Sequence, residues 1–535
     1  MRASRRVNAT VLATTVMSLL FAFACSGGDE PTSVTAPPQA PDAAAAAQPD
    51  GGDAAISESS IPQTTAEPPP APVGAKLLVG GDVFLLGTTN DGFALYIANS
   101  YGDGPLYAVS LAGGAPIQLA PFVHFSDVII QGNGVAFWTG VALNPLRGTL
   151  NLWTQATGLR PNLGMTVADA AYFSDDGSRV AFFVNPRPLA SPPRVDLAVT
   201  NVAAPSLAPV ISDLNQDPDT DLAPTCTPHL RYVGPLLYTA YCTVDRPLQS
   251  VFRAVSAAGV VTTIIDNTIP ANGVQSDFSL DATAQKAFFV GTNREARVLT
   301  MANGSTTVLD TNVVSGTGII SADGSTALYV KEIPPVSEED VPYFTLRRSP
   351  TAAPSPVTLH DAFGSLLAST ASLATALFTV SGVLPDGRSD LYLLDTIAPP
   401  GPPTTLSALT TASPVGFTQD GTQLLYLSDV GGSSGQGTLV VRNVATGAER
   451  TVSNKATRVR LAATGTKVVF CESPVQAAAP GDHSTCNIAS FDAATSAAAT
   501  VVVQKADPYF FSAGTQLVFA LMWGPSRGVY VKDAP

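Results

Sequence analysis

An Asp-Gly pair, or a close variant of it, recurs along this chain between two apolar runs. The clearest copies span residues 173–183, 320–329 and 417–426. Because Asp-Gly supplies the positive φ of a tight turn and the flanks are apolar, each copy predicts a β-hairpin. The second strand is apolar at consecutive positions, as in 180–184, which predicts a strand covered on both faces. Small antiparallel sheets stacked face to face satisfy this pattern.

Each hairpin is followed by a third strand, such as 104–110 or 437–442, and by a fourth, such as 115–119 or 448–452. Four strands in about 45 residues is the period of a β-propeller blade. The pattern therefore predicts an all-β propeller, as one large ring or two smaller ones. The segment 76–79 is expected to supply the fourth strand of the last unit, which hides sheet edges. About ten units are centred near Gly92, Gly134, Gly177, Gly234, Asp281, Gly324, Leu373, Gly421, Gly465 and Gly514.

The repeat resembles the TolB-type, WD40-like propeller repeat, whose core reads Phe-Ser-Pro-Asp-Gly followed by an apolar strand. Asp175, Ala322 and Gln419 stand where that pattern has Pro. The resemblance covers about residues 78–535. It implies a propeller that contacts cell-envelope proteins, although the N-terminal domain of TolB has no clear counterpart here.

The charge balance excludes two classes of partner. The formal net charge is −14, and only 13% of the residues are charged. Nucleic-acid binding needs Lys and Arg to neutralise phosphates, so no nucleic-acid partner is expected. Electrostatic docking on anionic lipid is disfavoured for the same reason.

The N-terminus has the features of an export signal. Arg2, Arg5 and Arg6 precede an uncharged stretch, 7–24, which ends at Cys25. The segment 22–25 resembles the bacterial lipobox, although Ala22 and Phe23 depart from its commonest form. The resemblance implies cleavage after residue 24 and a lipid on Cys25, which would anchor the mature chain to a membrane of the cell envelope. Ser26 favours the outer membrane. A transmembrane anchor and an ordinary secretory signal are the alternatives.

Residues 25–75 are expected to form a disordered tether. The stretch after Cys25 contains no aromatic residue, no Lys and no Arg, and it is rich in Ala and Pro. Such a composition cannot bury enough apolar surface to fold. The predicted organisation is therefore a signal peptide (1–24), a lipidated tether (25–75) and a propeller (76–535).

Four further cysteines fall into two pairs, each within one unit. Cys226 and Cys242 are equidistant from Gly234, at the predicted turn, and Cys471 and Cys486 flank one loop. We expect disulfides 226–242 and 471–486, which suit an oxidising compartment such as the periplasm. Buried free thiols are the alternative, and zinc is disfavoured because no Cys-x-x-Cys occurs.

No catalytic residue is expected from the sequence, because the four histidines (His124, His229, His360 and His483) fall in separate units. One cluster of alternating oxygen ligands suggests a weak Ca²⁺ site: Asp213, Asn215, Asp217, Asp219 and Asp221. Pro218 and Pro224 stand where a Ca²⁺ loop needs Gly and Glu, so a solvated loop is favoured and no cofactor is expected.

These observations favour a lipid-anchored cell-envelope propeller that binds or scaffolds proteins and is not an enzyme. Its partners would be envelope proteins of unknown identity, with the membrane reached through the lipid. Two alternatives stay open. A glycan-cleaving hydrolase or lyase would need carboxylates that converge on the central channel, and a surface lectin would bind Ca²⁺ or glycan.

Overall fold

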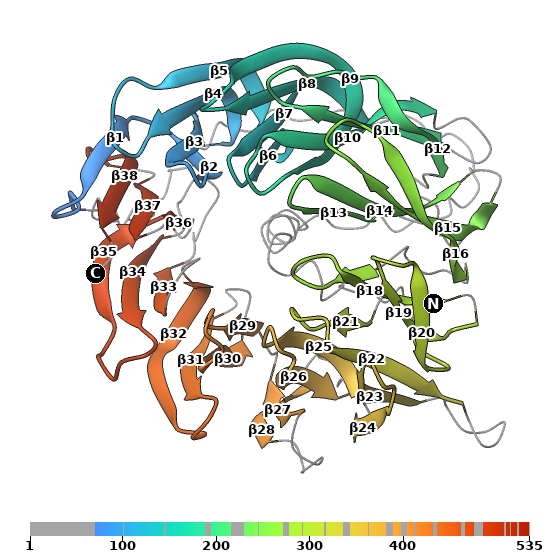
Figure 1. Ribbon diagram of the computed structural model, residues 1–535. Helices are drawn as coiled ribbons and strands as arrows, with labels where there is room; N and C mark the ends of the chain where they lie inside the picture. The colour runs from blue at the N-terminus through green and yellow to red at the C-terminus, as the bar shows by residue number, and fades with distance from the viewer. Residues whose placement is uncertain are drawn as a thin grey trace, which may run out of the picture. The chain divides into compact units, whose positions relative to one another are not determined.

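In the part of the chain that the structure describes, ten antiparallel units of four strands follow one another, as the hairpin repeat predicted (Figure 1). The computed structural model describes residues 70–533 except 100, 144–145, 188–193, 216–228, 244–245, 271–277, 292, 315–316, 335–342, 362, 381–388, 397–403, 411–412, 432–435, 462–465, 476–484, 508–509, 514 and 522–523. The predicted signal peptide, Cys25 and nearly all of the tether lie outside the described residues. Within these ranges, no helix is long and apolar enough to cross a membrane.

We number the units as blades 1–10 in chain order. Blade 1 consists of β2 (Phe84–Thr88), β3 (Phe93–Ile97), β4 (Asp103–Ser110) and β5 (Ile117–His124), and blade 2 of β6 (Val128–Gln131), β7 (Gly134–Leu143), β8 (Leu146–Thr154) and the first part of β9 (Gly158–Phe173). Blade 3 consists of the rest of β9, β10 (Arg179–Arg187), β11 (Arg194–Asn201) and β12 (Pro209–Asn215), and blade 4 of β13 (His229–Val233), β14 (Leu236–Thr243), β15 (Arg246–Val255) and β16 (Val261–Pro270). Blade 5 consists of β17 (Phe278–Leu280), β18 (Lys286–Val290), β19 (Ala296–Thr300) and β20 (Ser305–Asp310).

Blade 6 consists of β21 (Ile319–Ile320), β22 (Thr326–Ile333), β23 (Tyr343–Pro350) and β24 (Val357–His360), and blade 7 of β25 (Phe363–Ser369), β26 (Thr375–Val380), β27 (Ser389–Asp395) and β28 (Thr404–Thr410). Blade 8 consists of β29 (Ser413–Phe417), β30 (Gln423–Gly431), β31 (Gln436–Asn443) and the first part of β32 (Glu449–Leu461), and blade 9 of the rest of β32, β33 (Lys467–Val475), β34 (Thr485–Asp492) and β35 (Thr500–Ala506). Blade 10 consists of β36 (Phe510–Ala513), β37 (Gln516–Leu521), β38 (Gly528–Asp533) and β1 (Lys76–Gly80).

The blades form one ring rather than two. The first strand of each blade lies nearest the middle, and the fourth lies at the rim (Figure 1). The N-terminal strand β1 pairs with the C-terminal strand β38, with Lys76 opposite Val531 and Gly80 opposite Gly528. Strand β2 of blade 1 contacts β36 and β37 of blade 10. The prediction that 76–79 completes the last unit is therefore confirmed.

Two strands each belong to two blades. β9 pairs with β8 of blade 2 through its first part and with β10 of blade 3 through its second part. β32 links blades 8 and 9 in the same way, through β31 and β33. Strands β12 and β14 also pair, so blades 2–4 share one hydrogen-bonded sheet of eleven strands. The remaining neighbours meet mainly through side chains.

The core lies between the faces of neighbouring blades. On β7, Phe137 packs toward blade 1, whereas the adjacent Trp138 packs toward Phe182 of blade 3. Trp138 is fully buried, and its Nε1 donates to Thr166 Oγ1 at 2.8 Å. Strands that are apolar at consecutive positions are thus covered on both sides, as the sequence predicted.

The Asp-Gly turns lie at one end of the blades, together with the turns between third and fourth strands. We call this end the turn face and the opposite end the loop face. In blade 3, Gly177 has φ +69°, and Ser174 Oγ donates to Asp176 Oδ1 at 2.6 Å. Asp323 and Asp420 accept equivalent 2.6 Å hydrogen bonds in blades 6 and 8. A hydroxyl before the Asp therefore stabilises each turn.

These turns predict a loss of stability in acid. Hydrogen bonds from Ser321 and Ser325 lower the pKa of Asp323 to about 2, and similar bonds lower the pKa of Asp176 and Asp420. A carboxyl whose pKa is depressed by folding contributes stability above its unfolded pKa, about 4, and this stability is lost as the pH falls toward 2. The free energy of unfolding measured with urea should therefore fall between pH 4 and pH 2.5. Asp323→Asn should reduce that dependence; an unchanged dependence would contradict this role of Asp323.

Every rim strand pairs irregularly with its neighbour. All ten pairings of a third with a fourth strand contain a register shift. In three blades a polar side chain on the third strand accepts a hydrogen bond from a backbone N–H of the fourth at positive φ. These pairs are Asn151 with Asn162 (2.9 Å), Asp196 with Asp213 (2.9 Å) and Asn487 with Lys505 (3.2 Å). Such bulges discourage edge-to-edge association of exposed strands.

Cationic side chains connect several neighbouring blades near the turn face. Each donates a charge-assisted hydrogen bond to a backbone carbonyl of the next blade. The connections run from Arg179 to Ser256 (2.8 Å), Arg231 to Leu280 (3.4 Å), Lys286 to Gly324 (2.9 Å), Arg348 to Thr396 (3.2 Å) and Arg450 to Asp492 (3.2 Å).

Candidate protein-binding site

The loop face of blade 1 carries an unusual pair of exposed aromatic side chains. Tyr101, between β3 and β4, is 81% exposed, and Phe122, near the end of β5, is 62% exposed. Among the described residues, only Tyr343 joins them as an exposed aromatic side chain. Both lie at the same end of the β4–β5 hairpin, where Asp103 pairs with His124. We call Asn99, Tyr101, Asp103, Phe122 and residues 124–127 the blade 1 patch.

The loop that carries Tyr101 is held by its own polar groups. Asn99 Oδ1 accepts a hydrogen bond from Tyr101 N at 3.0 Å, and its Nδ2 donates to Asp103 Oδ1 at 3.2 Å. Gly102 has φ +83° and lies against Phe125, where an added Cβ would come within 2.9 Å of the ring. A larger residue at this position would therefore displace the loop from the patch.

A short 3₁₀ turn, η2 (Phe125–Asp127), forms the other half of the patch. His124 caps it: Nδ1 accepts from Ser126 N at 3.3 Å and lies 2.8 Å from Ser126 Oγ. Because the backbone N–H donates to Nδ1, this contact uses the imidazole nitrogen without its proton. Burial raises the pKa of Asp127, and the nearby His124 and Ser126 partly offset that rise.

Phe125 connects the patch to the core. Its N donates to Gly102 O at 2.7 Å, and its ring lies 5.4 Å from Phe84 and 4.4 Å from His124, measured between ring centroids. Two loops are thus fixed to each other and to β2. Aromatic anchors on a fixed platform lose little conformational entropy on binding, which is typical of protein-interaction sites.

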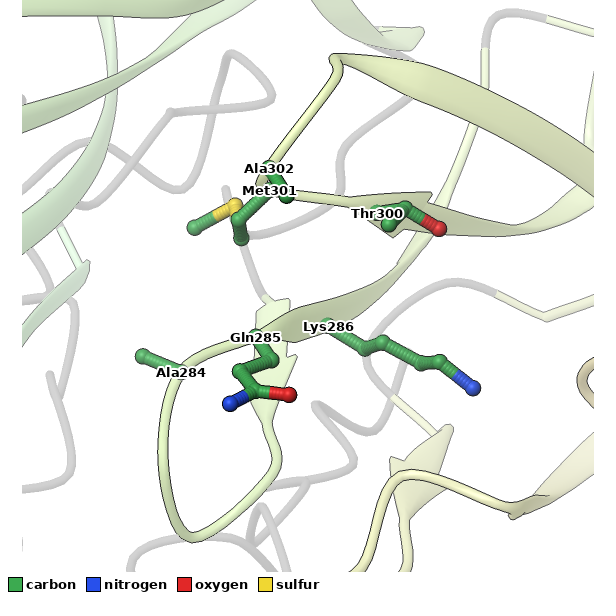
Figure 2. Close-up of a pocket in the computed structure, with 6 residues that line it drawn as sticks. All are labelled: Ala284, Gln285, Lys286, Thr300, Met301 and Ala302. Atoms are coloured by element: carbon green, nitrogen blue, oxygen red, sulfur yellow. The ribbon is translucent and has the colours of Figure 1, made fainter.

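A hollow lies elsewhere, on the turn face of blade 5. It measures about 340 Å³ and is lined by Ala284, Gln285, Lys286, Thr300, Met301 and Ala302 (Figure 2). Lys286 extends away from Met301, and its Nζ donates to Gly324 O and Thr351 Oγ1, both at 2.9 Å. The charged group nearest the hollow is therefore committed to blade 6, and the remaining lining offers no acid or base for catalysis.

The predicted disulfides have different outcomes. Cys471 and Cys486 form a disulfide with a Cα–Cα distance of 5.6 Å, in the core between blades 9 and 10. Cys226 lies outside the described residues, and Cys242 is placed only as a position in β14, opposite Ser250. In that hairpin Val233 pairs with Leu236, so the turn is centred between Gly234 and Pro235 rather than on Gly234. The 226–242 disulfide stays a prediction.

Most of the suggested Ca²⁺ ligands also lie outside the described residues: Asp217, Asp219 and Asp221. Asn215 is described only as the last position of β12. Asp213 Oδ1 lies 3.2 Å from Arg187 Nη2 and 3.5 Å from Arg194 Nη1, so this carboxylate already has cationic partners. Within the described ranges, no group of three or more His, Cys, Asp or Glu side chains is arranged to hold a metal.

Comparison with known proteins adds nothing about activity. No family model matches the chain. No curated protein matches it either. Solved structures with some likeness include an oligogalacturonate lyase in complex with manganese (14% identity, TM-score 0.34, 58% of this chain and 90% of that one), the tricorn protease (13%, 0.33, 79% and 43%) and the β-propeller domain of the trilobed protease from Pyrococcus furiosus (12%, 0.31, 57% and 94%). The chain spans less than half of the tricorn protease.

Most residues of the blade 1 patch carry no signal in the sequence. Tyr101 lies in a connection that varies in length from blade to blade, and Phe122 lies near the end of a rim strand, so no repeat position marks them. In the sequence, His124 is only an isolated histidine. The polar bulge residues do leave a signal: Asn151, Asp196 and Asn487 each precede Leu or Ile on the third strand.

Proposed function

We propose that this chain is an exported, lipid-anchored propeller that binds envelope proteins through the blade 1 patch. The observation that carries the proposal is the pair of exposed aromatic side chains, Tyr101 on a loop fixed by hydrogen bonds and Phe122 near the end of β5. Exposed Tyr and Phe are frequent anchors of protein interfaces, because one side chain buries a large area there.

The route of the chain into the ring supports this assignment. At the start of β1, Lys76 Nζ donates to Ala112 O, in a turn of the turn face, and Lys532 Nζ donates to Val73 O at 2.8 Å. After β1, Gly81 N donates to Arg527 O at 3.1 Å on the loop face. The N-terminal segment therefore enters the ring on the turn face, whereas the patch lies on the loop face.

Cross-linking in intact cells tests the binding site. The full chain with Tyr101→Ser and Phe122→Ser should lose the cross-linked partners that the unchanged chain retains. A matched control replaces two exposed apolar residues of other blades, Val260→Ser and Val501→Ser, and should retain them. Loss of the same partners from both variants, or from neither, would contradict a specific role of the patch.

The anchor is tested separately by Cys25→Ser. Without the thiol, the chain cannot take up a thioether-linked lipid, and we expect it to move from the membrane fraction to the soluble fraction. Buried methylenes contribute about 0.8 kcal/mol each, so losing the acyl chains should release nearly all of the protein. Incorporation of labelled palmitate should be lost in parallel. Membrane retention of Cys25→Ser at the original level would argue for a transmembrane segment instead.

A further inference from the structure

Blade 1 has no lysine or arginine of its own. From residue 77 to residue 146 the chain contains neither, although it contains four aspartates and one histidine, His124. Two of these aspartates, Asp103 and Asp127, belong to the blade 1 patch and are half-buried there. A Lys or Arg that neutralises them on the loop face therefore has to come from another blade or from another molecule.

Asp103 and the exposed Phe122 share one face of the β4–β5 hairpin. Val123 is 2% exposed and belongs to the core cluster shared with blade 2, whereas Phe122 and His124 on either side of it are exposed. Since side chains alternate along a strand, these two point away from blade 2. Asp103 pairs directly with His124, and paired residues lie on the same face. Asp103 is thus the diagonal neighbour of Phe122, and such neighbours lie about 7 Å apart.

The two carboxylates of the patch accept hydrogen bonds from neutral groups. Asn99 Nδ2 donates to Asp103 Oδ1 at 3.2 Å, and Ser126 Oγ donates to Asp127 Oδ1 at 3.3 Å. Across the described ranges, neither carboxylate forms an ion pair with a Lys or Arg. Asp82 differs, because its Oδ1 lies 3.2 Å from Arg527 Nε of blade 10. The patch therefore combines exposed aromatic rings with carboxylates that lack a Lys or Arg partner.

We propose that the blade 1 patch binds an arginine side chain of its protein partner, between the Asp103 carboxylate and the Phe122 ring. This inference rests on the proposed function of the patch. A planar guanidinium stacks on an aromatic face and donates hydrogen bonds to a carboxylate from its edge, which the compact ammonium group of lysine cannot do. Tyr101 offers a second aromatic face and Asp127 a second carboxylate. Arginine is also frequent among the residues that dominate protein interfaces.

Fluorescence anisotropy with a labelled peptide of three Gly-Arg-Ser repeats tests this inference on the full chain. The titration is run at low ionic strength and about pH 8, where imidazole groups carry no charge. We expect saturable binding of this peptide. Citrulline in place of arginine keeps the shape of the side chain without its charge and should weaken binding about tenfold. Lysine in place of arginine keeps the charge without the planar group and should weaken binding about threefold.

Variants of the chain locate the binding site. Asp103→Asn and Asp127→Asn should each weaken binding of the arginine peptide about fivefold, because each removes a charged acceptor. An asparagine at 103 still accepts the hydrogen bond from Asn99, so the loop should stay in place. Asp82→Asn makes the same charge change at a carboxylate that Arg527 already neutralises, and it should leave binding unchanged.

The inference would be overturned by the absence of saturable binding, by equal binding of the three peptides, or by equal effects of the three Asp→Asn changes. Such a result is distinguishable from failure of the proposed function. In that case the variant Tyr101→Ser, Phe122→Ser would still lose its cross-linked partners, and the patch would bind proteins without an arginine.

Discussion

Removing residues 70–80 is expected to open the ring and to lower the free energy of unfolding by several kcal/mol. The deletion takes away β1, which supplies the fourth strand of blade 10 and pairs with β38 from Lys76 to Gly80. About four ladder hydrogen bonds at roughly 1 kcal/mol each would be lost, together with the hydrogen bonds from Lys76 Nζ to Ala112 O and from Lys532 Nζ to Val73 O. Urea unfolding of the truncated and the unchanged chain measures the difference.

A second deletion provides the control. Removing residues 26–69 leaves every described strand in place, so its unfolding midpoint should equal that of the unchanged chain. The exposed edge of β38 should also make the first variant associate, which sedimentation would detect as larger species. Equal stability of the two deleted chains would show that the ring does not depend on β1.

Replacing Cys471 and Cys486 together by Ala is expected to cost about 3 kcal/mol. The disulfide closes a loop of 15 residues, for which the chain-entropy model gives this value. Both cysteines are almost fully buried, at 0% and 2% exposure, so the smaller alanine side chains also leave space in the core. Urea unfolding under oxidising conditions measures the loss.

Reduction separates this disulfide from the one predicted for Cys226 and Cys242. Dithiothreitol should destabilise the unchanged chain by at least the same amount. Any remaining sensitivity of the Cys471→Ala, Cys486→Ala variant to dithiothreitol would report the 226–242 disulfide. If the double variant were as stable as the unchanged chain, the 471–486 disulfide would not contribute to the free energy of unfolding.

The blades were predictable because their information is local. Gly177, Gly324 and Gly421 take the positive φ that the Asp-Gly pattern predicts, and the consecutive apolar residues of each second strand are covered by two neighbouring blades. Completion of the last blade by 76–79 was also predictable, since that unit otherwise has three strands. The choice between one ring and two depends on contacts between the chain ends, and the repeat does not specify them.

The candidate site was harder to predict because its residues act through contacts across loops. The Gly102–Phe125 contact joins segments that the repeat treats as separate connections. The turn predicted at Gly234 is centred half a residue later, because Pro235 also takes part in it.

Because β9 and β32 are each shared by two blades, some boundaries between blades are harder to separate than others. Blades 2–4 are joined by one continuous ladder, and so are blades 8 and 9, whereas the other five blades are separate hydrogen-bonded sheets. Transient separation at a boundary without a ladder breaks fewer backbone hydrogen bonds, so amide hydrogens there should exchange with solvent sooner. The propeller would then open locally between two rigid arcs and the single blades that connect them, rather than equally at all ten boundaries.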